Sequence, residues 1–487
     1  MEPTDRLTAC AILLATIAMA AAATTSDPLP PLPPGFGHAL RDHFIMAKGY
    51  TNLNQGSYGT VPKAVLAKQD TVRAFVEANP DAFLRTGLYP PSTQYPTGSP
   101  LYDGMNQTRF ALAKYLGADG EDVVLVENAS TGLSVVLRSV PRLLQDRALL
   151  YLDIAYICVK EAMAYLGGDV PGAAHGRPAG GPGELLVELN TTSLFQPAVR
   201  RNATAFDDAL VAMVGRAIDA RKGTAAEIAL ASFSHIVSLP GIVLPIARLV
   251  DACHARGVLV LVDGAHAPGQ IALDVPSLGA DFYVGNGHKW LYSPKGTAFV
   301  WVAKERQDMI YPCTLDSGIL QGFPGSFTWR GTRDYSAFLS IESALAFRAG
   351  VAPGGDAAIV QYLHGLAVRG GRLLAAALGT EMLPAAQTGA MVNVRVPCER
   401  ATTKDGCGGK LGIGTRLFRK YNFWVPFWGL ADQGTWMRLS AQIFIELSDF
   451  QMVADAIIAD LGLKDVVGVD AAPGDAASPV AIEAASI

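Results

Sequence analysis

The sequence predicts an α/β fold, in which a mostly parallel sheet sandwiched by helices is followed by a smaller α+β C-terminal domain. Short apolar runs end at polar residues, as in strands buried on both faces, and residues 258–262 before Asp263 are the clearest example. These runs alternate with helical patterns, which is typical of a parallel sheet. After residue 302 the alternation stops, and long helical patterns precede a group of short strands.

The chain begins with predicted helices at residues 63–78 and 102–116, where Pro62 suits a first helical turn and Gly117 a helix end. The alternating region then contains predicted strands at 122–126, 148–152, 184–189, 228–233, 258–262 and 280–284, and helices at 133–139, 157–166, 205–221 and 246–256. The C-terminal region contains predicted helices at 337–348, 357–378 and 448–461, and strands near 391–396, 423–426 and 436–440.

Length and composition limit the class of protein. A chain of 487 residues is long enough for two lobes with a sizeable core. Half of the residues are hydrophobic and 17% are charged, which excludes a disordered chain. The net charge of −5 gives no electrostatic reason to expect nucleic acid as a partner. Small molecules, or a second copy of the chain, are the expected partners.

The N-terminus differs from the rest of the chain. Residues 9–23 are apolar and rich in alanine, too short to span a bilayer comfortably, and residues 24–34 are rich in proline. We expect a signal peptide, although the acidic residues Glu2 and Asp5 fit one poorly and leave a signal anchor or no leader open. A cleaved leader predicts the secretory pathway or an extracellular location, and otherwise the cytoplasm. The predicted divisions are a signal peptide at 1–23, a linker and N-terminal segment at 24–48, a large domain at 49–335, a small domain at 336–465 and a disordered tail at 466–487.

The six cysteines give little support for a metal site, because no pair has the spacing of a zinc knuckle and no HExxH motif occurs. Cys398 and Cys407 bracket a polar insert and could form a local disulfide in an oxidising compartment.

Two predicted strand ends carry the side chains that indicate chemistry. Asp263 ends one apolar run, and Lys289 follows the next run 26 residues later, since 289 − 263 = 26. Ligands of open parallel sheets bind at the carboxyl ends of strands. An acid and a lysine placed there suit pyridoxal phosphate, because the lysine forms a Schiff base and the acid keeps the pyridine nitrogen protonated. The turn at residues 127–132 lies between a strand and a helix, and such a turn can bind a phosphate.

These strand ends resemble the class V aminotransferase family of pyridoxal-phosphate enzymes, which have fold type I, and within it the isopenicillin N epimerase-like proteins. The resemblance runs from Gly49 to Leu461 through segments that occur in order: NQGSYGTVP, ENASTG, SHIVSLPG, DGAHAPG, GNGHKW, RGTRD and MRLSAQIF.

The resemblance implies roles for individual residues around the cofactor. Lys289 would form the Schiff base and move the proton at Cα, and Asp263 would pair with the ring nitrogen. The remaining cofactor contacts that it implies are His266 at the phenolic oxygen, His288 beside the phosphate, Tyr156 stacked on the ring, and Ser130 and Thr131 as phosphate donors with a register uncertain by one. A strand-end cap, structural histidines and a core tyrosine are the alternatives for these residues.

The resemblance also implies substrate contacts and a second subunit. Arg438 would grip the substrate's α-carboxylate, while Asn54 and His235 would line the substrate side of the pocket. For Arg438 a surface position is the alternative, and for His235 a cap or core position. Gly331 and Thr332 would donate to the phosphate of a neighbouring subunit, which predicts a homodimer with shared active sites.

The reaction is less determined than the cofactor. The favoured hypothesis is an isopenicillin N epimerase-like enzyme acting at the α-carbon of a small amino acid, by epimerase, lyase or aminotransferase chemistry. A cysteine desulfurase or C–S lyase is the alternative, with Cys407 as a desulfurase nucleophile on a flexible loop. A noncatalytic binding protein of the same fold is a third hypothesis, against which the intact Lys289, Asp263 and Arg438 argue.

Overall fold

The computed structural model describes residues 29–85, 98–140, 147–167, 185–224, 226–316, 318–430 and 433–464. The predicted signal peptide and C-terminal tail lie outside these residues, as do residues 24–28 of the predicted linker. Among the described residues, no helix has both the length and the apolar character needed to cross a membrane. The predicted domain boundaries stay a prediction.

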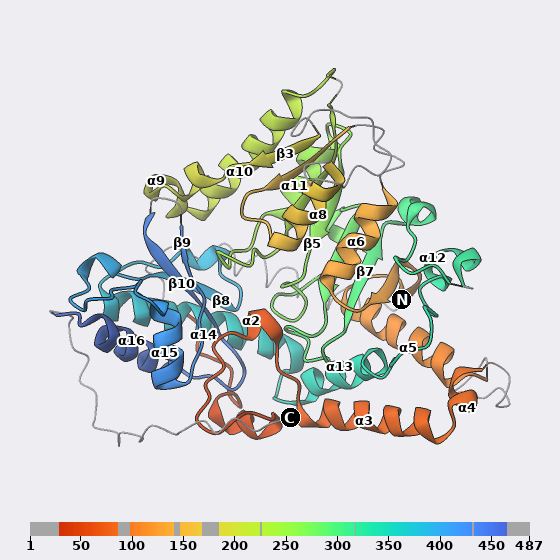
Figure 1. Ribbon diagram of the computed structural model, residues 1–487, viewed down its shortest axis with the longest axis horizontal. Helices are drawn as coiled ribbons and strands as arrows, with labels where there is room; N and C mark the ends of the chain where they lie inside the picture. The colour runs from red at the N-terminus through yellow and green to blue at the C-terminus, as the bar shows by residue number, and fades with distance from the viewer. Residues whose placement is uncertain are drawn as a thin grey trace.

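The larger sheet has seven strands in the order β1-β7-β6-β5-β4-β2-β3 (Figure 1). Neighbouring strands from β3 to β6 run parallel, whereas β7 is antiparallel to both β6 and β1. The strand bounds are β1 Val123–Val126, β2 Ala148–Leu152, β3 Leu186–Leu189, β4 Ile228–Ser234, β5 Leu259–Asp263, β6 Phe282–Asn286 and β7 Ala298–Val302. This arrangement confirms the predicted mostly parallel sheet.

Helices cover both faces of this sheet because its central strands are apolar on both sides. On β2, Leu149 and Tyr151 pack in the cluster that contains residues of α6 and α8, whereas Leu150 and Leu152 pack with those of α5, α10 and α11. The helices of the large region are α2 Gln55–Tyr58, α3 Lys63–Ala78, α4 Pro80–Leu84, α5 Pro100–Tyr115, α6 Ala129–Ser139, α8 Ile157–Gly167, α9 Pro197–Arg200, α10 Ala203–Asp219, α11 Ile246–His254 and α12 Gly322–Gly325.

The C-terminal part forms a smaller α+β region beside the large sheet, in which an antiparallel sheet of order β8-β10-β9 packs with α14 (Figure 1). Its elements are α13 Ile341–Gly350, α14 Gly355–Leu378, β8 Met391–Arg395, α15 Gly412–Tyr421, β9 Phe427–Gly429, β10 Thr435–Ser440 and α16 Leu447–Leu461.

One strand prediction in this region is wrong. The strand expected at residues 423–426 begins only at Phe427, because Pro426 has no amide hydrogen to donate to a neighbouring strand. Phe423 instead makes a single bridge with Thr51. The chain just before it forms α15, a helix that the sequence pattern did not indicate, which buries Ile413 and Leu417.

Candidate active site

The loops that could carry chemistry meet at one edge of the large sheet. Strands β2, β4, β5 and β6 are parallel, so their carboxyl ends lie at the same edge. Strand β7 runs against both β6 and β1, so β1 has the direction of β6 and its carboxyl end lies there too. The segments that follow these strands therefore converge.

A cavity of about 140 Å³ lies among these segments. Of the predicted site residues, Ser130, Tyr156, Asp263, His266, His288 and Lys289 line it. Its other lining residues are Ser57, Asn128, Ala129, Leu133, Cys158, Ser234, Ile236, Ser238, Ala265 and Asn286. The structure thus brings side chains from five strand ends and from the N-terminal segment into one site.

The amine of Lys289 is held inside this cavity. The residue follows β6 in a loop, and its Nζ lies 3.1 Å from Nε2 of His266. Burial lowers the pKa of Lys289 to about 8, an effect that Asp263 opposes and Arg438 reinforces. A lysine with this pKa is partly neutral near physiological pH, as a base or nucleophile must be.

Asp263 and His266 form the wall beside Lys289. Asp263 is the last residue of β5, and its Oδ1 accepts the amide hydrogen of Ala265 at 3.0 Å. Burial raises the pKa of Asp263, while the Ala265 amide and the Lys289 ammonium oppose this. Burial also lowers the pKa of His266 well below its usual range, and nearby cations add to the effect. His266 is therefore neutral, and its buried Nδ1 has no partner among the described residues.

The start of helix α6 forms another wall. Asn128 caps the helix, and its Oδ1 accepts both the amide and the hydroxyl hydrogen of Thr131. Asn286 at the end of β6 accepts the amide hydrogen of Ala129 at 2.8 Å. Ser130 lines the cavity, whereas the Thr131 hydroxyl turns back to the cap. Of the two predicted phosphate donors, Ser130 has the side chain that faces the cavity.

His288 and Tyr156 also line the cavity near the lysine. The His288 Nδ1 is 3.1 Å from the carbonyl oxygen of Thr297, so it carries the hydrogen of that bond. Burial lowers the pKa of His288 to about 4, and the adjacent Lys289 contributes. The Tyr156 ring is 47% exposed, and its centroid lies 5.9 Å from the Lys289 Nζ. An accessible ring at this distance could stack on a planar ligand bound to the amine.

Arg438 and Asn54 lie together beside the cavity, although neither lines it. Arg438 on β10 donates to Oδ1 of Asn54 at 2.9 Å and to the carbonyl oxygen of Ser238 at 2.6 Å. It also lies 3.3 Å from Oγ of Ser57, so it holds two lining residues. Burial lowers its pKa to about 10, and its Nε is buried with no partner among the described residues. A guanidinium with unused donor capacity fits the predicted carboxylate contact.

Three further predicted site residues do not line the cavity. His235 is buried with its Nδ1 2.9 Å from the Tyr283 hydroxyl oxygen, while its neighbours Ser234 and Ile236 line the cavity. Successive side chains of an extended segment point to opposite sides, so the expected pocket contact of His235 is not made. Gly331 and Thr332 do not line the cavity of their own chain, and Thr332 is exposed. Their role toward a second subunit stays a prediction.

Sequence reasoning missed Cys158 as a lining residue. It lies two residues after Tyr156, in the first turn of α8, and this spacing from the predicted ring-stacking position was the available signal. Burial raises the pKa of the Cys158 thiol, and a hydrogen bond from Ser130 opposes the shift. The thiol is therefore protonated at neutral pH and packs against the predicted phosphate donor.

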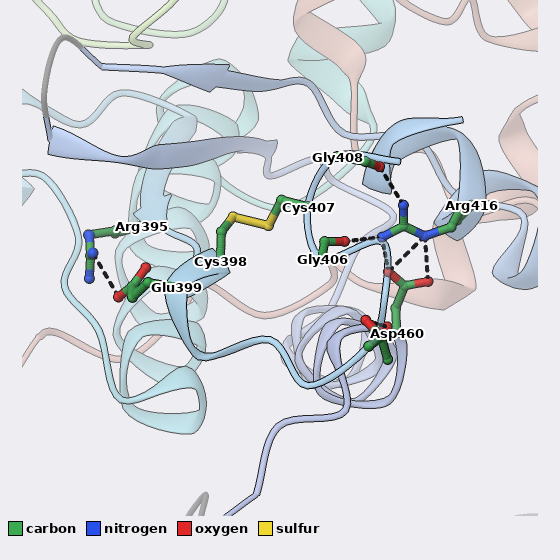
Figure 2. The surroundings of a disulfide bond; sticks show 9 residues. Arg395, Cys398, Glu399, Gly406, Cys407, Gly408, Arg416 and Asp460 are labelled. Atoms are coloured by element: carbon green, nitrogen blue, oxygen red, sulfur yellow. Dashed lines mark hydrogen bonds and ion pairs between the residues drawn. A yellow bond between two sulfur atoms is a disulfide. The ribbon is translucent and has the colours of Figure 1, made fainter. Parts of the chain in front are cut away.

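Cys407, the proposed desulfurase nucleophile, is bound to Cys398 in a disulfide with a Cα–Cα distance of 5.4 Å (Figure 2). Arg416 holds the backbone on both sides of Cys407, because it donates to the carbonyl oxygens of Gly406 and Gly408. Cys407 does not line the cavity.

The chain is similar in sequence to known proteins over most of its length. Residues 216–345 match the family model described as "Aminotransferase class-V". The L-cysteine desulfhydrase-like protein lolT1 of Epichloe uncinata is 28% identical over 471 residues, covering 87% of this chain and 95% of that protein. The hercynylcysteine sulfoxide lyase of Schizosaccharomyces pombe is 26% identical, covering 87% of this chain and 97% of the relative. The isopenicillin N epimerase of Amycolatopsis lactamdurans is 28% identical, with coverages of 86% and 96%.

Solved structures show the same fold at low sequence identity. The apo cysteine desulfurase of Thermococcus onnurineus NA1 superposes with a TM-score of 0.66 at 15% identity, covering 89% of this chain and 100% of that one. A C-DES variant with glycine covalently linked to its PLP cofactor gives a TM-score of 0.64 at 19% identity, with coverages of 87% and 99%.

The donor set of the cavity suits pyridoxal phosphate. Lys289 offers an amine for the aldehyde, Asp263 a carboxylate for the ring nitrogen, and Ser130 a hydroxyl at a helix N-terminus for the phosphate. The buried and unpartnered Nδ1 of His266 supplies a further polar contact. The family match over residues 216–345, the relatives and this site together indicate a pyridoxal-phosphate enzyme that is similar to the class V aminotransferases.

Proposed function

We propose that this enzyme is a C–S lyase that releases sulfide or a small thiol from a cysteine-like L-amino acid. The observation that carries the proposal is the disulfide between Cys398 and Cys407. A desulfurase must transfer sulfur to a free cysteine of the enzyme, and the residue expected to accept it is bound to another sulfur. The relatives named as an L-cysteine desulfhydrase-like protein and a hercynylcysteine sulfoxide lyase support C–S cleavage.

Separate residues of the chain bind the substrate carboxylate, remove the Cα proton and orient the lysine amine. Pyridoxal phosphate, when bound, supplies an electron sink for the charge left at Cα. Arg438 receives the substrate carboxylate through its guanidinium and so orients the Cα–H bond. Lys289, with a pKa of about 8, takes the proton from Cα. Neutral His266, 3.1 Å from the lysine amine, accepts a hydrogen bond from that amine and keeps it directed into the cavity.

The bonds balance in the proposed elimination. The Cα–H bond breaks with its proton moving to Lys289, and the Cβ–S bond breaks with its electron pair leaving on sulfur. The sulfur takes up a proton and departs as sulfide or thiol. The remaining three-carbon enamine hydrolyses in water to pyruvate and ammonia, so no external oxidant or reductant is required.

The lining of the cavity favours a small, uncharged substrate side chain. Among the described lining residues, Asp263 is the only carboxylate and Lys289 the only lysine or arginine, and both are assigned to the cofactor. Ser57, Ser238 and Ile236 remain for the side chain, and they offer two hydroxyls and an apolar surface. Cysteine, or cysteine with a small substituent on sulfur, matches this surface.

The test is to incubate the purified, cofactor-loaded chain with L-cysteine, D-cysteine and S-methyl-L-cysteine. We expect sulfide or methanethiol together with equal amounts of pyruvate and ammonia. Lys289→Ala should abolish release, whereas Lys304→Ala, an exposed lysine outside the site, should not. Alanine formation in place of pyruvate would refute the elimination and favour a desulfurase. No cofactor retention and no turnover would favour the noncatalytic hypothesis.

Epimerisation at Cα is the second candidate. It shares the removal of the Cα proton by Lys289, and the isopenicillin N epimerase of Amycolatopsis lactamdurans, matched over 86% of this chain, favours it. In deuterated water an epimerase would exchange the α-proton and invert the amino acid without releasing sulfide. The same incubations therefore separate the two reactions.

We further propose a secreted homodimer. Thr332 is exposed and Gly331 does not line the cavity of its own chain, as expected of residues that reach a partner's site. The Cys398–Cys407 disulfide supports an oxidising compartment. Light scattering and N-terminal sequencing of the exported protein test these statements; a monomer with full activity, or a retained residue 1, would contradict them.

A further inference from the structure

Arg348 on α13 has no exposed surface and lies outside the cavity, yet it touches two loops of the active site. Its Nη1 donates to the carbonyl oxygen of Trp290 at 2.6 Å, directly after Lys289. Its Nη2 donates to the carbonyl oxygen of Gly269 at 3.0 Å, three residues after His266. One guanidinium therefore joins the loop of the lysine to the loop of Asp263 and His266.

The two loops approach each other closely at this point. Gly269 has a φ of +84°, and a Cβ added there would lie 2.6 Å from the Trp290 carbonyl oxygen. Only glycine permits this conformation and this distance without strain. The negative ends of the two carbonyl dipoles converge on Arg348, and its positive charge makes their approach favourable.

The rest of the guanidinium is also paired, which fixes its position. Its Nε donates to Asp356, and the Tyr115 hydroxyl donates to the same carboxylate at 3.2 Å. The buried charge is thus neutralised by an acid on α14, while both terminal nitrogens remain for the loops. The Asp356 side chain is 35% exposed, but its loss would leave the fully buried guanidinium without a compensating charge.

The backbone of the lysine is held from a second direction. Gln55, fully buried in α2, donates through Nε2 to the carbonyl oxygen of Lys289 at 2.7 Å. Arg348 holds the next carbonyl along the chain. The peptide units before and after Trp290 are therefore both fixed, so the backbone that carries the Lys289 side chain is constrained.

We propose that Arg348 is a positioning residue, which sets the Lys289 amine against Asp263 and His266 by fixing the carbonyls of Trp290 and Gly269. It acts through these loops and does not touch the cofactor or the substrate. The proposal does not depend on which reaction the enzyme catalyses, because it concerns the geometry of the amine.

The test compares Arg348→Lys and Arg348→Gln with Asp356→Asn and Tyr115→Phe in the full-length chain. Arg348→Lys and Arg348→Gln lose the guanidinium, whose two terminal nitrogens bind both carbonyls. The last two weaken the same buried cluster but keep the guanidinium on the loops. Thermal unfolding of all four variants measures their general destabilisation, so that the comparison is made between variants of similar stability.

The readout is the rate at which Lys289 of the cofactor-free chain captures pyridoxal phosphate, trapped by borohydride and identified by peptide mass. A displacement of the amine by about 1 Å should slow this capture roughly 10- to 100-fold in the Arg348 variants. The pH at which Lys289 reacts with an amine-directed reagent should also rise from near 8.

The expected result for Asp356→Asn and Tyr115→Phe is capture within about threefold of the wild type, at wild-type pH dependence. If capture slowed as much in Asp356→Asn and Tyr115→Phe as in the Arg348 variants, Arg348 would only stabilise the fold, and the proposal would be overturned. Unchanged capture in both Arg348 variants would overturn it as well.

Discussion

Replacing Arg438 by lysine tests the carboxylate contact on which substrate orientation depends. The buried guanidinium uses its two terminal nitrogens for Asn54, Ser57 and the Ser238 carbonyl, whereas its Nε has no partner among the described residues. A bidentate carboxylate would therefore bind Nε and replace one of the terminal-nitrogen contacts. A lysine keeps the charge but loses one of two parallel hydrogen bonds. A hydrogen bond to a charged group contributes about 1.5–3 kcal/mol, which corresponds to a loss of roughly 10- to 150-fold in kcat/KM.

The assay measures sulfide release from L-cysteine and from L-cysteine methyl ester, whose carboxyl group carries no charge. Wild-type enzyme should prefer the free acid strongly, and Arg438→Lys should lose most of that preference because its penalty falls on the acid alone. Arg419→Lys, an exposed substitution on α15, is the matched control and should behave as wild type. An equal loss of kcat/KM for acid and ester would show that Arg438 supports the fold and does not bind the carboxylate.

Three further predictions follow from the site and the disulfide. In the cofactor-free chain, Lys289 should react faster with an amine-directed reagent as the pH rises through about 8, because only the neutral amine reacts. The pKa of an ordinary lysine is about 10.4. A midpoint above about 10 would contradict the lowered pKa of Lys289. Replacing Cys398 and Cys407 by serine should lower the free energy of unfolding by about 2–3 kcal/mol in chemical denaturation and change sulfide release less than twofold; loss of sulfide release at unchanged stability would instead support a desulfurase role for Cys407. Tyr156→Ala should weaken cofactor binding roughly 3- to 10-fold in a fluorescence titration while Tyr156→Phe should not, and equal behaviour of the two would exclude ring stacking.

The strand-end chemistry could be predicted because it follows from a rule of sheet topology. An apolar run that ends at a polar residue marks the carboxyl end of a buried strand, and parallel neighbours bring such ends together. Asp263 and the loop of Lys289 meet for this reason, since β5 and β6 are parallel neighbours. The sequence also indicated His266 as a partner of the lysine, because His266 lies in the turn after β5, the strand that ends at Asp263.

Other features depended on which way a side chain points, which proximity along the chain does not reveal. His235 lies between two lining residues but faces Tyr283, since extended chain alternates its sides. Which of Ser130 and Thr131 has a hydroxyl free to face the cavity depends on the cap, because the Thr131 hydroxyl donates to Asn128. Nothing local in the sequence indicated the role of Arg348, because the two loop carbonyls to which it donates are 58 and 79 residues away.

The contacts between β10, which carries Arg438, and the segment around Asn54 bear on the order in which the chain can fold during synthesis. The Ser440 amide donates to the carbonyl oxygen of Leu53, and the Ser440 hydroxyl receives the amide hydrogen of Gly56. These contacts join an N-terminal segment to β10, the last strand in the described part of the chain, and Leu53 and Ser440 are 440 − 53 = 387 residues apart. At a synthesis rate of roughly 5–20 residues per second, a ribosome needs about 20–80 s to make the residues between them. Residues 53–57 therefore cannot make these contacts until β10 has been synthesised. This side of the active site forms only late in the synthesis of the chain.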